Sequence, residues 1–150
     1  MRPLQPLLRR HYAYLAKDFL APLLDTLNVG RATFDGDLDK LLIMLVVAMR
    51  TAEDRRVLDI DLDDVLSGAV QAYPSLTTNV RSIADSTGIP KESVRRKVTA
   101  LAEGGGIHRD GHNLSLAPYA SRQLTDFREQ LFQLALRYHQ MIETVQAQEG

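Results

Sequence analysis

The segment from residue 82 to residue 98 constrains the fold more than any other part of this 150-residue chain. Its sequence, SIADSTGIPKESVRRKV, predicts a helix, a glycine turn and a second helix. Gly88 can adopt the positive φ that a sharp turn between helices needs, and Pro90 suits the first position of the following helix. That helix has an apolar side with i, i+4 and i+7 spacing, formed by Val94, Val98 and Leu101.

The opposite side of the second predicted helix is polar and includes basic residues. At about 100° per residue, this side holds Glu92, Arg96, Thr99 and Glu103, flanked by Ser93 and Arg95. Lys97 lies nearer the apolar stripe, and we expect its ammonium group to extend past that stripe to solvent.

A β-hairpin is predicted directly after the second helix. Gly104, Gly105 and Gly106 can end the helix, and a favoured turn dipeptide, Asp110-Gly111, then separates two short apolar segments. Helix, turn, helix and basic hairpin follow one another in this order in a winged helix-turn-helix. In that architecture the second helix enters the major groove of DNA and the hairpin lies along the backbone.

Residues 77–118 resemble the DNA-binding module of bacterial regulators of the IclR type and, more loosely, of the MarR and GntR types. The resemblance is carried by Thr87-Gly-Ile-Pro-Lys-Glu-Ser-Val-Arg-Arg, then Leu101, then Arg109-Asp-Gly with Leu114 and Leu116. It implies that Lys91, Ser93, Arg95 and Arg96 lie at the DNA surface and Arg109 in the wing. IclR-type regulators place this module first and a large effector domain after it, whereas here the module is central to C-terminal and no such domain is expected.

We expect DNA contacts from the helix-turn-helix and from the wing. The candidate residues are Thr78, Arg81, Lys91, Glu92, Ser93, Arg95, Arg96, Thr99, His108, Arg109 and His112. Thr78 and Arg81 open the first helix of the motif, where they can anchor phosphates. Six basic residues oppose four acidic ones between residues 78 and 112, but four oppose nine between residues 35 and 64. The acidic segment should therefore face away from DNA.

Three further helices are expected before the motif. The first runs from about Pro6 to Leu27, is kinked near Pro22 and ends at residues 28–30. Its inner side is expected to hold Leu4, Leu8, Tyr12, Leu15, Phe19 and Leu23.

The second expected helix starts after Asp37, its N-cap, and runs to about Glu53. Its nine apolar residues, 41–49, are too few for a membrane span and indicate a buried helix. A third helix is predicted over 61–72, ended by Pro74, and Thr77 or Thr78 would cap the helix leading to Ser86. Either the second or the third could be the first helix of the winged module.

A long C-terminal helix is predicted from Tyr119 to Ala147, about 43 Å in length. Its heptad seam consists of Leu124, Phe127, Leu131, Leu134, Tyr138, Met141 and Val145. We expect this seam to pack on the N-terminal helix and on a second subunit, and the alternative is a helix folded back onto its own chain. A two-fold dimer would present two recognition helices to half-sites roughly 34 Å apart.

Several classes of chemistry find no support in the sequence. The chain has no cysteine, which excludes disulfides, zinc-thiolate sites and cysteine nucleophiles. No serine stands in a triad context, residues 104–106 lack the features of a phosphate loop, and residues 59–64 lack the glycine and glutamate of a calcium loop. His108 and His112 bracket a hairpin turn rather than one helix face. We therefore expect no enzymatic activity, no cofactor and no metal.

Taken together, the sequence predicts a mainly α protein that forms a single compact domain over 1–150. It comprises N-terminal helices (1–60), a winged helix-turn-helix with a small β-hairpin wing (61–118) and a C-terminal dimerisation helix (119–150). The expected function is a sequence-specific, cytoplasmic bacterial transcriptional regulator. It would act as a homodimer on a two-fold operator in double-stranded DNA, with room for an unidentified small-molecule effector. The alternative is a winged-helix protein–protein interaction module. The N-terminus lacks the apolar core of a signal peptide, and no membrane association is expected.

Overall fold

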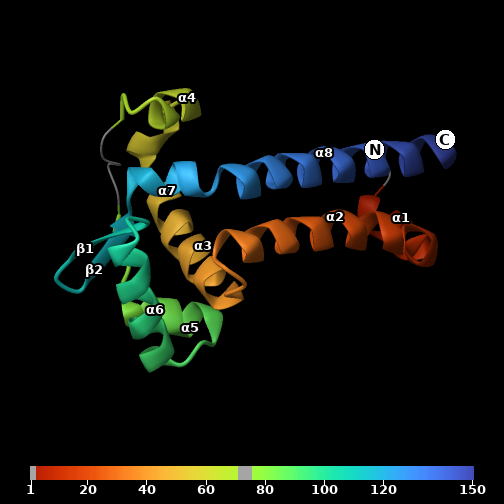
Figure 1. Cartoon of the computed structure of the whole chain (residues 1–150). Helices are drawn as coiled ribbons and strands as arrows, with labels where there is room; N and C mark the ends of the chain where they lie inside the picture. The colour runs from red at the N-terminus through yellow and green to blue at the C-terminus, as the bar shows by residue number, and fades with distance from the viewer. Residues whose placement is uncertain (1–2, 71–75) are drawn as a thin grey trace. The chain divides into compact units, whose positions relative to one another are not determined.

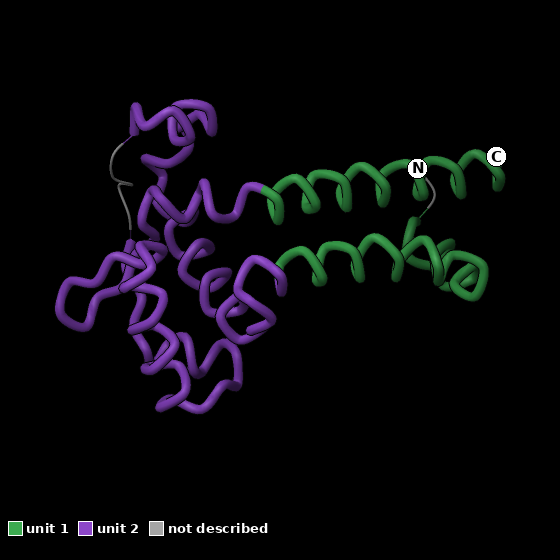
Figure 2. Tube along the Cα trace, in the orientation of Figure 1, with its two compact units in different colours: residues 1–30, 126–150 green, residues 31–125 purple. Residues whose placement is uncertain are grey.

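The computed structural model describes residues 3–70 and 76–150 and is mainly helical, with one small antiparallel sheet (Figure 1). The chain divides into two compact units, Met1–Gly30 with Asp126–Gly150 and Arg31–Thr125 (Figure 2). The sequence pattern indicated one compact domain instead. No helix within the described ranges is long and apolar enough to cross a membrane.

The first unit is built from α1 (Leu4–Arg10), most of α2 (Tyr12–Thr33) and nearly all of α8 (Thr125–Gln148). Its core is formed by Leu7, Leu15, Met141 and Val145. Tyr138 Oη donates a 2.7 Å hydrogen bond to the carbonyl oxygen of Phe19, and the two rings lie 5.7 Å apart. Together these contacts hold the N-terminal helices against α8.

The predicted N-terminal helix is wrong at its break and at its end. The interruption falls at His11 (φ −103°), and Pro22 lies inside α2. The helix also continues past Gly30, which is buried within it, to Thr33. The chain turns only at residues 35 and 36, which both have positive φ. Glycine is tolerated inside a helix at a cost of about 1 kcal/mol, so a single glycine does not have to end one.

The C-terminal helix is also divided. A short helix, α7 (Pro118–Gln123), precedes α8, and Leu124 between them has a non-helical ψ of 9°. The seam was expected to pack on the N-terminal helix and on a second subunit, and its residues Met141 and Val145 are buried against Leu7 and Leu15 of the N-terminal helices. Leu124 and Phe127 are buried as well, whereas Leu131 stays 40% exposed. Four of the seven predicted seam residues are therefore buried within the chain itself.

The second unit centres on α3 (Leu38–Ala52), which packs against α5 (Val80–Thr87), α6 (Lys91–Glu103) and β2 (Asn113–Leu116). Its innermost side chains are Leu41, Ile43, Met44, Val47, Ile83, Val94, Val98 and Leu114. The predicted cap of α3 is confirmed, since the Asp37 carboxylate accepts a 3.1 Å hydrogen bond from Lys40 N. The long apolar run is therefore a core helix, as expected.

The third helix, predicted over 61–72, is shorter than expected. Among its described residues only α4 (Leu62–Leu66), which Asp61 caps, is helical, and the 3₁₀ helix η1 (Arg55–Asp59) precedes it. Gly68, with φ +86°, follows the end of α4. The rest of the prediction, residues 71 and 72 with Pro74, lies outside the described residues.

The sheet consists of β1 (Ile107–Asp110) and β2, paired antiparallel from Ile107–Leu116 to Asp110–Asn113. The hairpin is as predicted, but its two-residue turn is Gly111-His112, one residue later than Asp110-Gly111. Gly111 has φ +60°, and a glycine at the first position suits a type II′ turn. The other edge of β2 makes one bridge, in which Thr78 and Leu114 exchange two 2.9 Å backbone hydrogen bonds.

Candidate nucleic-acid interface

The turn between α5 and α6 is fixed by local hydrogen bonds. Asn79, rather than either predicted threonine, caps α5 by accepting a 2.9 Å bond from Ser82 N. Asparagine is among the strongest capping residues, and Thr78 is already committed to the bridge with β2. At the other end Gly88 has φ +76°, and its N–H donates to the carbonyl oxygen of Ala84. Pro90 then precedes the first residue of α6.

The buried side of α6 sets which of its side chains reach solvent. Val94 and Val98 are fully buried and Leu101 is 5% exposed, as their spacing predicted. Lys91, Arg95 and Arg96 are exposed on the remaining surface of the helix. The apolar stripe thus orients these basic residues outward.

Four cationic side chains from three elements line one open groove of the second unit. Arg81 comes from α5, Lys91 and Arg95 from α6, and Arg109 from β1. The remaining lining residues are Asn79, Val80, Gly111, His112 and Leu114. This set contains no carboxylate, so the groove concentrates positive charge without an internal counter-charge. Five of the predicted DNA contacts meet here.

Arg95 has one acidic neighbour on its own helix. Its guanidinium forms an ion pair with Glu92, one turn away, and the two side chains are 51% and 80% exposed. Exposed pairs of this kind contribute little stability. A phosphate group could therefore replace Glu92 as the partner of Arg95 at small cost.

Lys97, the third residue of the basic run, forms an ion pair within the second unit. Its ammonium lies 2.6 Å from Asp37 Oδ2, and the two side chains are only 18% and 27% exposed. Burial opposes ionisation of Asp37, but hydrogen bonds from Lys97 and from Lys40 N outweigh it and lower the pKa of Asp37. The ion pair links α6 to the N-terminus of α3.

The other predicted contacts lie outside the groove. Arg96 and Thr99 are exposed on α6, Ser93 is half-buried, and His108 is exposed on β1. Thr78 is only 8% exposed, so the prediction that it anchors a phosphate needs correction. Asn79, rather than Thr78, lines the groove beside the basic residues. An asparagine directly before a helix is a capping signal that the sequence did contain.

Comparisons with protein-family models, with curated proteins and with solved structures all find nothing similar to this chain. The function is therefore inferred from the side chains that line the groove of the second unit.

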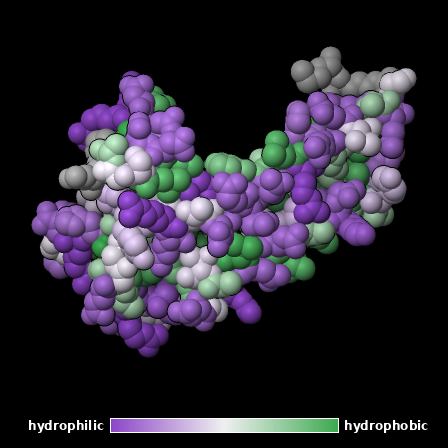
Figure 3. Space-filling model, turned by 45° about the horizontal axis from the view of Figure 1, so that its top comes forward, coloured by the Kyte–Doolittle hydropathy of each residue, from purple (hydrophilic) through white to green (hydrophobic). Residues whose placement is uncertain are grey.

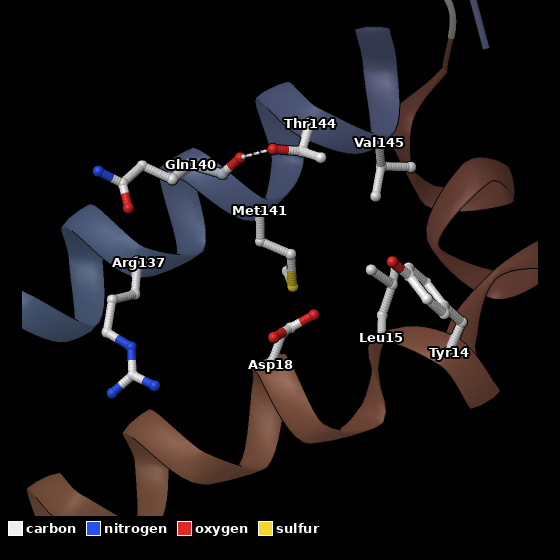
Figure 4. A pocket seen from close by; sticks show the side chains of 8 residues that line it. All are labelled: Tyr14, Leu15, Asp18, Arg137, Gln140, Met141, Thr144 and Val145. Atoms are coloured by element: carbon white, nitrogen blue, oxygen red, sulfur yellow. Dashed lines mark hydrogen bonds between the residues drawn. The ribbon is translucent and has the colours of Figure 1, made fainter. Parts of the chain in front are cut away.

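A second pocket lies in the first unit, between α2 and α8. Figure 4 shows Leu15 and Asp18 of α2 and Met141 of α8 pointing into the space between the helices, and Arg137 of α8 also lines the pocket. Arg137 pairs with Asp25 at 3.3 Å, and Thr144 donates to the carbonyl oxygen of Gln140. The residues that line this pocket assemble no catalytic constellation. No group of three or more potential metal ligands occurs among the residues that the structure describes.

Proposed function

We propose that residues 31–125 form a winged helix-turn-helix that binds duplex DNA. The order of α3, the Thr78 bridge, α5, α6 and the β1–β2 hairpin supports this fold. In this interpretation α3 is the first helix of the module, because it packs against both α5 and α6. The hairpin is the wing.

The observation that carries the proposal is the groove shared by Arg81, Lys91, Arg95 and Arg109. Protein–DNA complexes use such cations to neutralise phosphates, which supplies most of the sequence-independent affinity. The three elements that provide them are those that contact DNA in winged helix-turn-helix proteins. A merely solvated basic helix face would not need Arg81 and Arg109 to converge on it.

In the complex, α6 would enter the major groove with Arg95, Arg96 and Thr99 on its exposed side. Arg109 and His112 would follow the backbone from the wing, and Arg81 would anchor a phosphate beside α5. The protein would act as a transcriptional regulator, reading a two-fold operator as a homodimer with half-sites roughly 34 Å apart.

A fluorescence anisotropy titration of labelled random-sequence duplex tests this function. We expect binding at low salt and a steep, linear fall of log affinity with log salt concentration. Selection from a random duplex library should then enrich a two-fold sequence. If no duplex binds even at low salt, the winged unit is a protein-interaction module instead.

A further inference from the structure

Helix α6 has two different surfaces exposed to solvent. At about 100° per residue, Lys91 and Arg95 lie roughly 55–95° from the centre of the buried stripe, on the side of the helix that lines the groove of the second unit. The second surface lies roughly 130–175° from that centre, opposite the core. We call this surface the outer face, and its residues, all exposed, are Glu92, Arg96, Thr99 and Glu103.

The groove and the outer face differ in charge. Four cationic side chains and no carboxylate line the groove, whereas one arginine and two glutamates give the outer face a net charge of −1. A surface with that balance of charge repels phosphates. It is compatible with base edges in the major groove, where a carboxylate can accept a hydrogen bond from N4 of cytosine. The charges therefore favour phosphates at the groove and bases at the outer face.

The groove continues from α6 to the wing. Arg109, Gly111 and His112 line it there, and Figure 3 shows mainly hydrophilic side chains, in purple, at the tip of the hairpin at the left of the view. Arg81 of α5 lines the groove as well. A DNA strand whose backbone follows these residues would meet Arg95 at the flank of α6. The outer face would then point into the major groove.

Arg96 is the residue of the outer face that can recognise guanine. In the major groove guanine presents the acceptors O6 and N7 side by side, and so requires a pair of donors from the protein. The glutamates provide only acceptors, and the Thr99 hydroxyl already donates to the carbonyl oxygen of Arg95 at 3.0 Å. The guanidinium of Arg96, by contrast, holds several N–H donors in a planar fork.

We propose that Arg96 recognises one guanine in the major groove, with N–H groups donating to O6 and N7, while Arg95 binds a backbone phosphate beside it. This assignment rests on the proposed function, because it requires duplex DNA to bind with α6 in the major groove. It gives two adjacent arginines different purposes. Arg96 contributes specificity for a base, whereas Arg95 contributes affinity that does not depend on the sequence.

Titration of altered duplexes tests the guanine contact. Selection from a random duplex library first identifies the sequence that the native protein prefers. Anisotropy titrations then compare that duplex with duplexes in which one G·C pair at a time is changed to A·T. The native protein should lose roughly 5- to 150-fold in affinity at one guanine of each half-site, which is the discrimination expected of a bidentate arginine.

Two variants of Arg96 identify the residue that makes this contact. Arg96→Ala should bind the original and the altered duplex equally, with a salt slope within about half a unit of the native slope. Arg96→Gln should prefer adenine at the same position, because a glutamine amide forms paired hydrogen bonds with N6 and N7 of adenine. Retained helical circular dichroism shows that each variant is folded. An Arg96→Gln variant that still selects guanine overturns the proposal.

Arg95→Ala is the matched control, because it removes the same charge from the preceding position of the same helix. It should keep the guanine discrimination and lower the salt slope by about one unit. If Arg96→Ala keeps the native discrimination at every position, or lowers the slope as much as Arg95→Ala does, the assignment of Arg96 is wrong while DNA binding stands. If the native protein binds no duplex at low salt, the proposed function fails and the assignment fails with it.

Discussion

Lys97 Nζ lies 2.6 Å from Asp37 Oδ2, and this contact joins the proposed recognition helix to the N-terminus of the central core helix. Asp37 serves two purposes, because its other oxygen caps α3 through Lys40 N. The basic run on α6 is thus divided by function. Arg95 and Arg96 are exposed to solvent, whereas Lys97 ties α6 to the N-terminus of α3.

Loss of the Lys97 ammonium should lower stability without removing a DNA contact. We expect Lys97→Met to reduce the free energy of unfolding by about 1 kcal/mol, since a partly buried charge-assisted hydrogen bond disappears. Urea denaturation measures this change. Asp37→Ala should cost more, about 2 kcal/mol, because the helix cap is lost as well. If Lys97→Met instead left stability unchanged and lowered the salt slope of DNA binding, Lys97 would be a phosphate contact.

The lowered pKa of Asp37 makes this contribution dependent on pH. A carboxyl group with a depressed folded pKa stabilises the protein above its unfolded value, here near 3.8. The stabilisation is lost as the pH falls from that value through the folded pKa. Thermal unfolding from neutral to acidic pH should therefore show native protein and Asp37→Asn separated at neutral pH and converging below pH 3.8. Asparagine keeps the cap, so a gap that persists at the acid end would contradict the ionic origin.

The turn before α6 depends on a left-handed residue. An added Cβ at Gly88 would meet nothing within 4 Å, so only the positive φ opposes a side chain there. Gly88→Ala should cost about 1 kcal/mol, and Gly88→Asn less, because asparagine tolerates this conformation better. Gly104→Ala is the matched control, since Gly104 has φ −78° and ordinary contacts. Equal losses of stability at both glycines would exclude this account of the turn.

The apolar stripe of α6 should affect stability rather than binding chemistry. Val98 is fully buried, so Val98→Ala should lower the free energy of unfolding by roughly 1–3 kcal/mol. Arg96→Ala, two residues earlier on the exposed surface, should change it by less than about 0.5 kcal/mol. Denaturant unfolding of the two variants compares them directly. Similar values would mean that the helix is oriented differently.

Local sequence patterns predicted the helix-turn-helix segment and the hairpin because their signals act over a few residues. Gly88 marks a turn that needs positive φ, and Val94 and Val98 mark a buried side by spacing alone. The convergence of Arg81, Lys91 and Arg109 was harder to foresee. It depends on how α5, α6 and the hairpin pack, which no short pattern specifies.

The terminal helices show why the remaining parts of the fold could not be predicted from the sequence. An apolar seam indicates burial but does not identify the partner, so Met141 and Val145 could equally well pack on their own chain. Leu23 was expected inside with Leu15 and Phe19, but steps of four residues drift by roughly 40° each on a helix. That drift carries Leu23 away from the buried side of α2, and it is 40% exposed. The helix predicted over 61–72 ends early at Leu66, where Ser67 is the C-cap and Gly68 follows with φ +86°.

The salt dependence of DNA binding tests the central claim most directly. Arg81, Arg95 and Arg109 replaced together by alanine should weaken binding to duplex DNA and reduce the slope of log affinity against log salt by about three units, one for each lost phosphate contact. Arg55→Ala, an exposed arginine that does not line the groove, should leave both quantities unchanged after correction for net charge. A triple variant with native affinity and native slope would contradict the assignment of this groove as the DNA-binding surface.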